Sequence, residues 1–245
     1  MFIVILAAVL PAIGLLYFIW KKDHYRQEPT RELLKAYGYG MLSIPASLLL
    51  SGPLMALGAY TMQPETVGDA IRTALFGAGI PEELAKLLML WLFLRKSRYY
   101  DEYIDGVVYA ACVGLGFATL ENIGYLFDNL SQWFSVGVAR GLLSVPAHFF
   151  FAVTMGYFYS LASFGDPRRR SRNLILAAGV PILLHATFDA ILMASSLATG
   201  IASSLILLFL GIYLYLVISS KKRIRDLLAR DENFLQEDSQ EEPKA

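Results

Sequence analysis

The amino-acid sequence predicts an all-α, polytopic membrane protein, a bundle of about seven transmembrane helices. Of its 245 residues, 56% are hydrophobic and only 17% are charged, and the mean hydropathy is +0.49. A soluble domain of this size typically has about 25% charged residues. The chain is therefore too apolar to surround itself with a polar surface, and lipid must be the solvent for much of it.

Seven apolar segments are each long enough to cross a hydrocarbon core of about 30 Å, which needs about 20 residues of helix. They are residues 2–20, 36–60, 71–94, 104–127, 140–163, 173–197 and 202–220. The first segment lacks the positively charged start of a secretion signal, and its basic residues, Lys21 and Lys22, follow it. We expect it to be retained as the first span.

The basic residues gather on one side of the predicted bundle. Eighteen of the 21 lie in residues 21–35, 95–102 and 164–172 or after residue 220. Short loops rich in Lys and Arg remain in the cytoplasm. This distribution predicts a multi-pass protein with its N-terminus outside and its C-terminus in the cytoplasm.

The chain divides into one transmembrane helical domain, residues 1–222, and a short cytoplasmic tail, residues 223–245. The tail becomes acidic and polar after Asp231, which predicts that it is largely disordered. The single cysteine, Cys112, excludes an intrachain disulfide and a cysteine-based metal site. No segment resembles a nucleotide-binding loop or a nucleic-acid motif, so we expect no nucleic-acid partner.

Several ionisable side chains lie inside the apolar segments, where each costs about 3 kcal/mol to insert. Helical periodicity places those of the third segment on one face, and a four-residue spacing does the same in the sixth. Their depths along the spans predict that they meet in one cavity open to the outer side. They are Glu82, Glu83 and Lys86 in the third segment, Glu121 beside Asn122 in the fourth, His148 in the fifth, and His185 and Asp189 in the sixth.

The fourth segment has a small residue at every fourth position, near the face that bears Glu121. These residues, Gly106, Ala110, Gly114 and Ala118, form a seam of small residues along one face. In membranes, such a seam allows a second helix to approach closely. We expect a neighbouring helix to pack there.

Each polar group also has a purely structural interpretation. The charges of the third segment can form a buried ion pair, and the pair in the sixth can form a polar clasp. Glu121 with Asn122 can join two helices, and His148 alone is more often a hydrogen-bonded interior histidine. Arg140 is expected to be an interfacial anchor. Carboxylates or histidines at compatible depth in four spans nevertheless favour a functional site.

The residue types suit hydrolysis. Two adjacent carboxylates resist simultaneous ionisation, which favours one of them as an acid or base near neutral pH. Two histidines and a further carboxylate can hold a metal ion or stabilise an oxyanion. A His, His, Glu ligand set with a separate glutamate base is a known hydrolytic zinc arrangement.

Four short motifs resemble those of the PrsW intramembrane proteases. Residues 82–86 (EELAK) resemble an EExxK motif, and residues 117–122 (FATLEN) resemble an FxxxEN motif. Residues 146–148 (PAH) and 185–189 (HATFD) resemble the third and fourth motifs. All four occur in order, over about half of the chain. PrsW proteins are similar in turn to the CAAX-type prenyl endopeptidases, which tend to have a histidine and an asparagine where this chain has a glutamate and an aspartate.

The resemblance implies an intramembrane endopeptidase of the bacterial cytoplasmic membrane. Its partners would be the lipid bilayer and a membrane-anchored protein substrate, such as an anti-sigma factor. We expect Glu82 or Glu83 to be the general base that activates water. Lys86 would offset the charge of this carboxylate pair, and Asn122 would support the site.

The other motif residues are expected to act on the water and on the scissile carbonyl. Glu121, His148 and His185 would bind a divalent metal ion such as zinc or, without metal, orient water and polarise the carbonyl. Asp189 would orient His185 or join the coordination. Both the metal-dependent and the metal-free versions are compatible with the sequence.

Two alternatives use the same residues differently. In a proton-coupled transporter or channel they would form a proton relay, although the sequence has no clear internal repeat of the kind that many transporters contain. In a non-enzymatic immunity or scaffold protein they would be remnants of an ancestral site. Proton flux in liposomes indicates the first, and normal function after loss of the carboxylates indicates the second.

Overall fold

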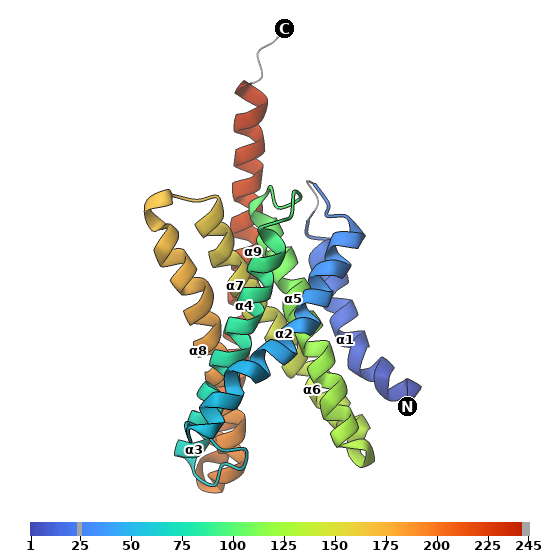
Figure 1. Cartoon of the computed structure of the whole chain (residues 1–245), viewed down its shortest axis with the longest axis vertical. Coiled ribbons are helices and arrows are strands. Elements are labelled where there is room, and N and C mark those ends of the chain that lie inside the picture. The colour runs from blue at the N-terminus through green and yellow to red at the C-terminus, as the bar shows by residue number, and fades with distance from the viewer. Residues whose placement is uncertain (24–25, 242–245) are drawn as a thin grey trace.

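The structure, a computed structural model, describes residues 1–23 and 26–241 and is a bundle of helices (Figure 1). Short 3-10 turns precede α6, α8 and α9. The described ranges contain no strand, and the predicted all-α polytopic bundle is confirmed. In chain order the longer elements are α1 (Phe2–Trp20), α2 (Thr30–Ala56), α3 (Val67–Arg72), the π-helix η1 (Thr73–Gly79), α4 (Ile80–Leu94), α5 (Tyr103–Asp128), α6 (Trp133–Leu142), α7 (Ser144–Ser163), α8 (Arg170–Leu197) and α9 (Ala202–Glu241).

Within the described residues, six helical segments are long and apolar enough to cross a membrane. They contain α1, α2, α5, α6 together with α7, α8, and α9. The predicted third span, residues 71–94, is instead covered by α3, η1 and α4, each shorter than 18 residues. The predicted fifth span, residues 140–163, is split, because α6 ends at Leu142 and α7 begins at Ser144.

A π-helical stretch joins α3 to α4 just ahead of Pro81. Proline has no N–H to donate to the carbonyl four residues earlier, and its ring clashes with that carbonyl. The wider π turn takes up this mismatch and lets the chain continue into α4. Such π-bulges are frequent at functional sites, and this one directly precedes Glu82 and Glu83.

The helices end alternately at two ends of the bundle (Figure 1). The connections after α1, α4 and α7 lie at the end from which the C-terminal part of α9 projects, and those after α2, α5 and α8 lie at the opposite end. The basic segments found in the sequence are therefore at one end. The side of a membrane that this end faces stays a prediction.

The central helix is α5, which packs against α7, α2 and α1. In its most apolar 18-residue window 89% of the residues are buried, against 44% or less in the other candidate spans. Small residues allow this packing, because a Cβ at Gly114 would lie 2.6 Å from the Cβ of Ala152 on α7. At Gly116, a Cβ would overlap the backbone carbonyl of Tyr37 on α2. The predicted seam thus faces α7.

The last helix, α9, differs from the predicted disordered tail, residues 223–245. It continues without a break to Glu241. Beyond the predicted span, Ile224 and Leu227 are buried against the bundle, and Asp231 accepts hydrogen bonds from two backbone N–H groups at the start of α5. These contacts hold the extension in place as a helix. Residues 242–245 lie outside the described residues.

Candidate active site

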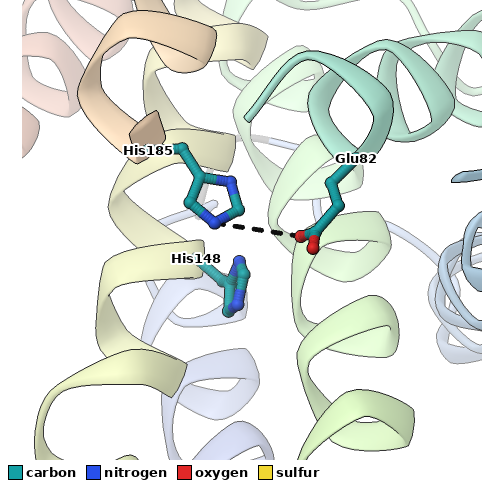
Figure 2. A group of neighbouring side chains, drawn as sticks. All are labelled: Glu82, His148 and His185. Carbon is teal, nitrogen blue, oxygen red and sulfur yellow. Dashed lines mark ion pairs between the residues drawn. The ribbon is translucent and has the colours of Figure 1, made fainter. Parts of the chain in front are cut away.

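Four helices bring the polar residues of the apolar segments together. α4 contributes Glu82, Glu83 and Lys86, and α5 contributes Glu121 and Asn122; His148 comes from α7, and His185 and Asp189 come from α8. Figure 2 shows Glu82, His148 and His185 pointing toward one another from three of these helices. The sequence predicts this meeting from depth alone, and the packing of α5 against α7 and of α7 against α8 produces it.

The centre of the cluster is formed by one carboxylate and two imidazoles. Glu82 Oε2 lies 3.8 Å from His185 Nε2. The rings of His148 and His185 meet edge to face, with centroids 5.1 Å apart. Both histidines are buried, whereas the Glu82 side chain is 14% exposed. Glu82 is therefore the group at this centre that solvent reaches most easily.

Lys86 supplies the positive charge beside the glutamates. Its ammonium lies 2.8 Å from Glu83 Oε1 and 3.4 Å from Glu82 Oε2. It also lies 3.2 Å from Nδ1 of His148 and over the ring of Phe117, 3.8 Å from the ring centroid. A buried ammonium needs this number of partners to offset its lost hydration. The offsetting role predicted for Lys86 thus has a geometric basis.

His185 is held between two carboxylates and an aromatic ring. Its Nδ1 lies 2.9 Å from Glu83 Oε1, and its Nε2 lies 3.3 Å from Asp189 Oδ2. The ring stacks on Phe151 at a centroid distance of 5.0 Å. Because Glu83 is fully buried and its Oε1 contacts both Lys86 and His185, it fixes these two groups relative to each other.

Glu121 forms a second pair at the edge of the cluster. Its Oε2 lies 2.6 Å from Arg140 Nη2 and 3.0 Å from His148 Nε2. Arg140 also donates to Asn122 Oδ1 (2.9 Å) and stacks on the ring of Tyr125. Asn122 in turn donates to the backbone carbonyl of Ala8 (3.1 Å), which ties α1 to this edge.

Arg140 differs from its prediction as an interfacial anchor. It is only 15% exposed and contacts two residues of the FxxxEN-like motif. The signal in the sequence is its position eight residues before His148, which corresponds to about two helical turns. Because the helix breaks between α6 and α7, this spacing does not by itself place Arg140 on the same face as His148. The structure is needed to show that Arg140 lies beside Glu121.

The residues that lie close enough to share a metal ion overlap the predicted ligand set at His148 and His185. The residues that can converge on a metal ion are Glu82, His148 and His185, whose nearest ligand atoms lie within 4.8 Å of one another. Glu121, the third predicted ligand, lies beside His148, and its Oε2 is engaged by Arg140 and His148. Two imidazoles and a carboxylate are a ligand set of catalytic zinc sites that keep one position open for water. The group therefore fits such an ion by residue type and by proximity.

Comparison with known protein families supports this interpretation over most of the chain. Residues 28–218 match the model of a family described as PrsW family intramembrane metalloprotease. The chain belongs to this family. All four motifs lie within the matched range, so the resemblance seen in the sequence is confirmed and the protein is an intramembrane protease.

Relatives named Protease PrsW show the same similarity. One from Clostridioides difficile (strain 630) is 36% identical over 190 residues, which cover 77% of this chain and 78% of the relative. One from Bacillus subtilis (strain 168) is 36% identical over 197 residues, covering 80% and 85% of the two chains. One from Geobacillus kaustophilus (strain HTA426) is 34% identical over 194 residues, covering 79% and 81%. No solved structure matches the chain.

Proposed function

We propose that this PrsW family protease hydrolyses a peptide bond in a membrane-anchored protein, with water held between Glu82, His148 and His185. The observation that carries the proposal is the convergence of these three side chains, from three helices, within 4.8 Å. A carboxylate facing two imidazoles in a largely buried site is suited to deprotonating water and to steadying the charge that develops on the substrate.

Glu82 rather than Glu83 is the proposed general base. Glu82 is partly exposed and faces Nε2 of His185, whereas Glu83 is fully buried and contacts Lys86 and the other nitrogen of His185. Glu82 takes a proton from water as the oxygen attacks the scissile carbonyl, and it returns a proton to the leaving amine. Glu83 acts through its neighbours and is a positioning residue.

His185 is the proposed donor to the developing oxyanion. Its ring is held by Glu83 at Nδ1 (2.9 Å), and Nε2 has the longer contact with Asp189 (3.3 Å). Donation to the oxyanion therefore comes from Nε2 and takes the place of the contact with Asp189. An imidazole fixed in this way keeps its orientation without reorganising during the reaction, which is the basis of electrostatic catalysis. Glu121 and Arg140 hold His148 from the opposite edge.

A divalent metal ion fits the same three residues. When bound, it would be held by Glu82, His148 and His185, and it would supply the Lewis acidity that makes a coordinated water a better nucleophile. Both histidines have the same constraint. The two nitrogens of His148 contact Lys86 and Glu121, and those of His185 contact Glu83 and Asp189. Each ring nitrogen offers a single site, so ligation requires each histidine to give up one of these contacts.

The substrate class follows from the family resemblance. A membrane-anchored regulatory protein such as an anti-sigma factor presents a peptide bond near the membrane surface, at the depth expected for this cluster. The exposed fractions of Glu82 and Asp189, 14% and 23%, give such a segment access to the site.

The test uses purified full-length protein in lipid nanodiscs with a single-span substrate. We expect Glu82→Gln to lower the cleavage rate by about 10²–10⁴-fold, the usual range for a lost general base. Glu83→Gln is expected to cost about 10–100-fold, because an outer partner of a catalytic group acts indirectly. Glu65→Gln, in an exposed connection, is the matched control and should leave the rate unchanged.

The outcomes separate the parts of the proposal. Normal cleavage by Glu82→Gln, Glu83→Gln and a His185→Ala variant together would refute the catalytic assignment. Full activity in chelator, with no stoichiometric metal in the sample, would remove the metal ion and leave the role of Glu82 intact. Loss of activity in chelator, restored by zinc, would support both the bound metal ion and the role of Glu82.

A further inference from the structure

A second group of carboxylates lies at the other end of α5. Asp23 follows α1, Glu102 directly precedes α5, and Asp105 lies in its first turn. Their nearest carboxylate oxygens lie within 4.8 Å of one another. This acidic cluster is sixteen residues of helix away from Glu121, which corresponds to about 24 Å. It is thus separate from the candidate active site.

The cluster is buried to an unusual degree for its charge. Asp23 and Asp105 have no exposed surface, and Glu102 is 2% exposed. Isolated carboxylates are rarely buried, because the ionised form loses its hydration. Asp and Glu that are fully buried are normally paired with a cation or hydrogen-bonded on all their oxygens.

The backbone at the start of α5 satisfies only part of this need. Oδ2 of Asp105 accepts from the N–H groups of Asp101 (2.9 Å) and Glu102 (2.7 Å). The next two N–H groups donate to Asp231 on α9. The free donors of this helix end are therefore already used, and its partial positive charge is shared between two carboxylates.

Oxygens of Asp105 and Glu102 have no donor. Among the described residues, Oδ1 of Asp105 and Oε2 of Glu102 are buried and lack a hydrogen-bond partner, although the Glu102 side chain faces the N–H of Asp105 in a capping box. Arg26 approaches the cluster from one side, with its Nε 3.7 Å from Oε1 of Glu102. Arg26 is 52% exposed and also contacts Asp101, so it does not fill the space between the buried oxygens.

Neighbouring acids add to the negative charge. Glu28 is also buried, and it accepts a hydrogen bond from the hydroxyl of Tyr109. Four buried carboxyl side chains, those of Asp23, Glu28, Glu102 and Asp105, are therefore packed together at this end of α5.

We propose that Asp23, Glu102 and Asp105 bind a hard divalent cation, Mg²⁺ or Ca²⁺. Carboxylate oxygens are the ligands that these ions prefer, whereas the two imidazoles of the catalytic cluster favour zinc. The ion ties the end of α1 to the start of α5. Because Asp231 caps the same turn of α5, the ion also stabilises the docking of α9. This inference does not depend on the proposed catalytic roles.

The test measures thermal unfolding of the purified full chain in detergent, after removal of metal with chelator. Added Mg²⁺ or Ca²⁺ should raise the unfolding midpoint, by about 5–10 °C at a concentration 100 times the dissociation constant. The larger effect of the two identifies the preferred ion. Terbium luminescence, excited through nearby tyrosines, reports occupancy of the same site without any measurement of proteolysis.

Charge-neutral variants provide the contrast. Glu102→Gln and Asp105→Asn should lose at least 10-fold in cation affinity and most of the shift. Asp23→Asn is the second variant, should loss of the α5 cap in Asp105→Asn prevent folding. Glu82→Gln, in the catalytic cluster, should keep the shift in full. A wild-type midpoint insensitive to millimolar Mg²⁺ and Ca²⁺, or an equal shift in Glu102→Gln, would overturn the proposal.

Discussion

At the scale of single residues, the candidate site depends on pairs that reach across helices. Glu121 and Arg140 come from α5 and α6, and their charged atoms lie 2.6 Å apart with both side chains less than 20% exposed. This pair also positions His148, because Glu121 Oε2 lies 3.0 Å from its Nε2. Such a largely buried pair costs much more to break on one side than to remove completely.

A double-mutant cycle tests this pair. We expect Arg140→Gln to lower both the unfolding midpoint and the cleavage rate, the latter by about 10–100-fold, since it leaves Glu121 without its main counter-charge. The double variant Glu121→Gln with Arg140→Gln should be less impaired in stability than the sum of the single effects, by about 1–3 kcal/mol.

The control for this cycle is an exposed pair of similar length. Arg72 lies 2.6 Å from Asp69, but it is 59% exposed. Exposed ion pairs contribute about 0–1 kcal/mol, so Arg72→Gln should change neither readout. Strict additivity of the Glu121 and Arg140 substitutions would show that the two side chains are not coupled.

Residue types and spacing predict which residues belong to the site better than they predict which side chains those residues contact. An ionisable residue inside an apolar span is visible in the sequence, which is why Glu82, His148 and His185 are identifiable. Which carboxylate faces the histidines depends on the rotation of α4, and adjacent residues of a helix point about 100° apart. The choice between Glu82 and Glu83 therefore needs the structure, as does the place of Arg140.

At the scale of helices, the position of His148 depends on how closely α7 approaches α5. A Cβ at Gly114 would lie 2.6 Å from the Cβ of Ala152 and 3.2 Å from the backbone carbonyl of His148. The seam of small residues predicts this contact from the sequence alone. The cap that Asp231 gives to α5 was not predictable, because it joins residues more than 120 positions apart.

Gly114→Val should separate these two helices. We expect it to destabilise the protein by about 1–3 kcal/mol, the usual cost of overpacking, and to reduce cleavage by displacing His148. Gly124→Val, on the same helix but with no atom within 4 Å of the added Cβ, is the matched control. Thermal unfolding and cleavage rates measure both. Equal behaviour of the two variants would mean that the contact between α5 and α7 does not position the site.

At the scale of the whole molecule, hydropathy and charge predict the architecture well, since both reflect the solvent around the chain rather than particular contacts. They fail where a helix is interrupted, as at η1 ahead of Pro81, or where a helix continues past its apolar span, as α9 does to Glu241. Particular residues decide the conformation in both places. Pro81 does so after η1, and Ile224, Leu227 and Asp231 do so in α9. Composition over a window does not report such contacts.

We expect the end with the basic connections to face the cytoplasm, and labelling of single cysteines can test this orientation. The chain has one cysteine, Cys112, which is buried, so a Cys112→Ala background has no other thiol. An impermeant maleimide added to intact cells should label Glu65→Cys and Ser131→Cys, in the connections after α2 and α5. It should label Lys96→Cys and Ser171→Cys, beside the basic connections, only after the cells are opened.

All four labelling positions are exposed, so reactivity depends on the side of the membrane and not on burial. We expect the basic connections to remain inside, because moving Lys and Arg across the membrane during insertion is unfavourable. Glu121 lies seven residues before the end of α5, about 10 Å along the helix, and this is the end that carries Ser131. Labelling of Ser131→Cys from outside therefore also places the catalytic cluster in the outer half of the membrane. The reverse pattern, with Lys96→Cys reactive in intact cells, would place it in the inner half and direct the search for substrates to the cytoplasmic side.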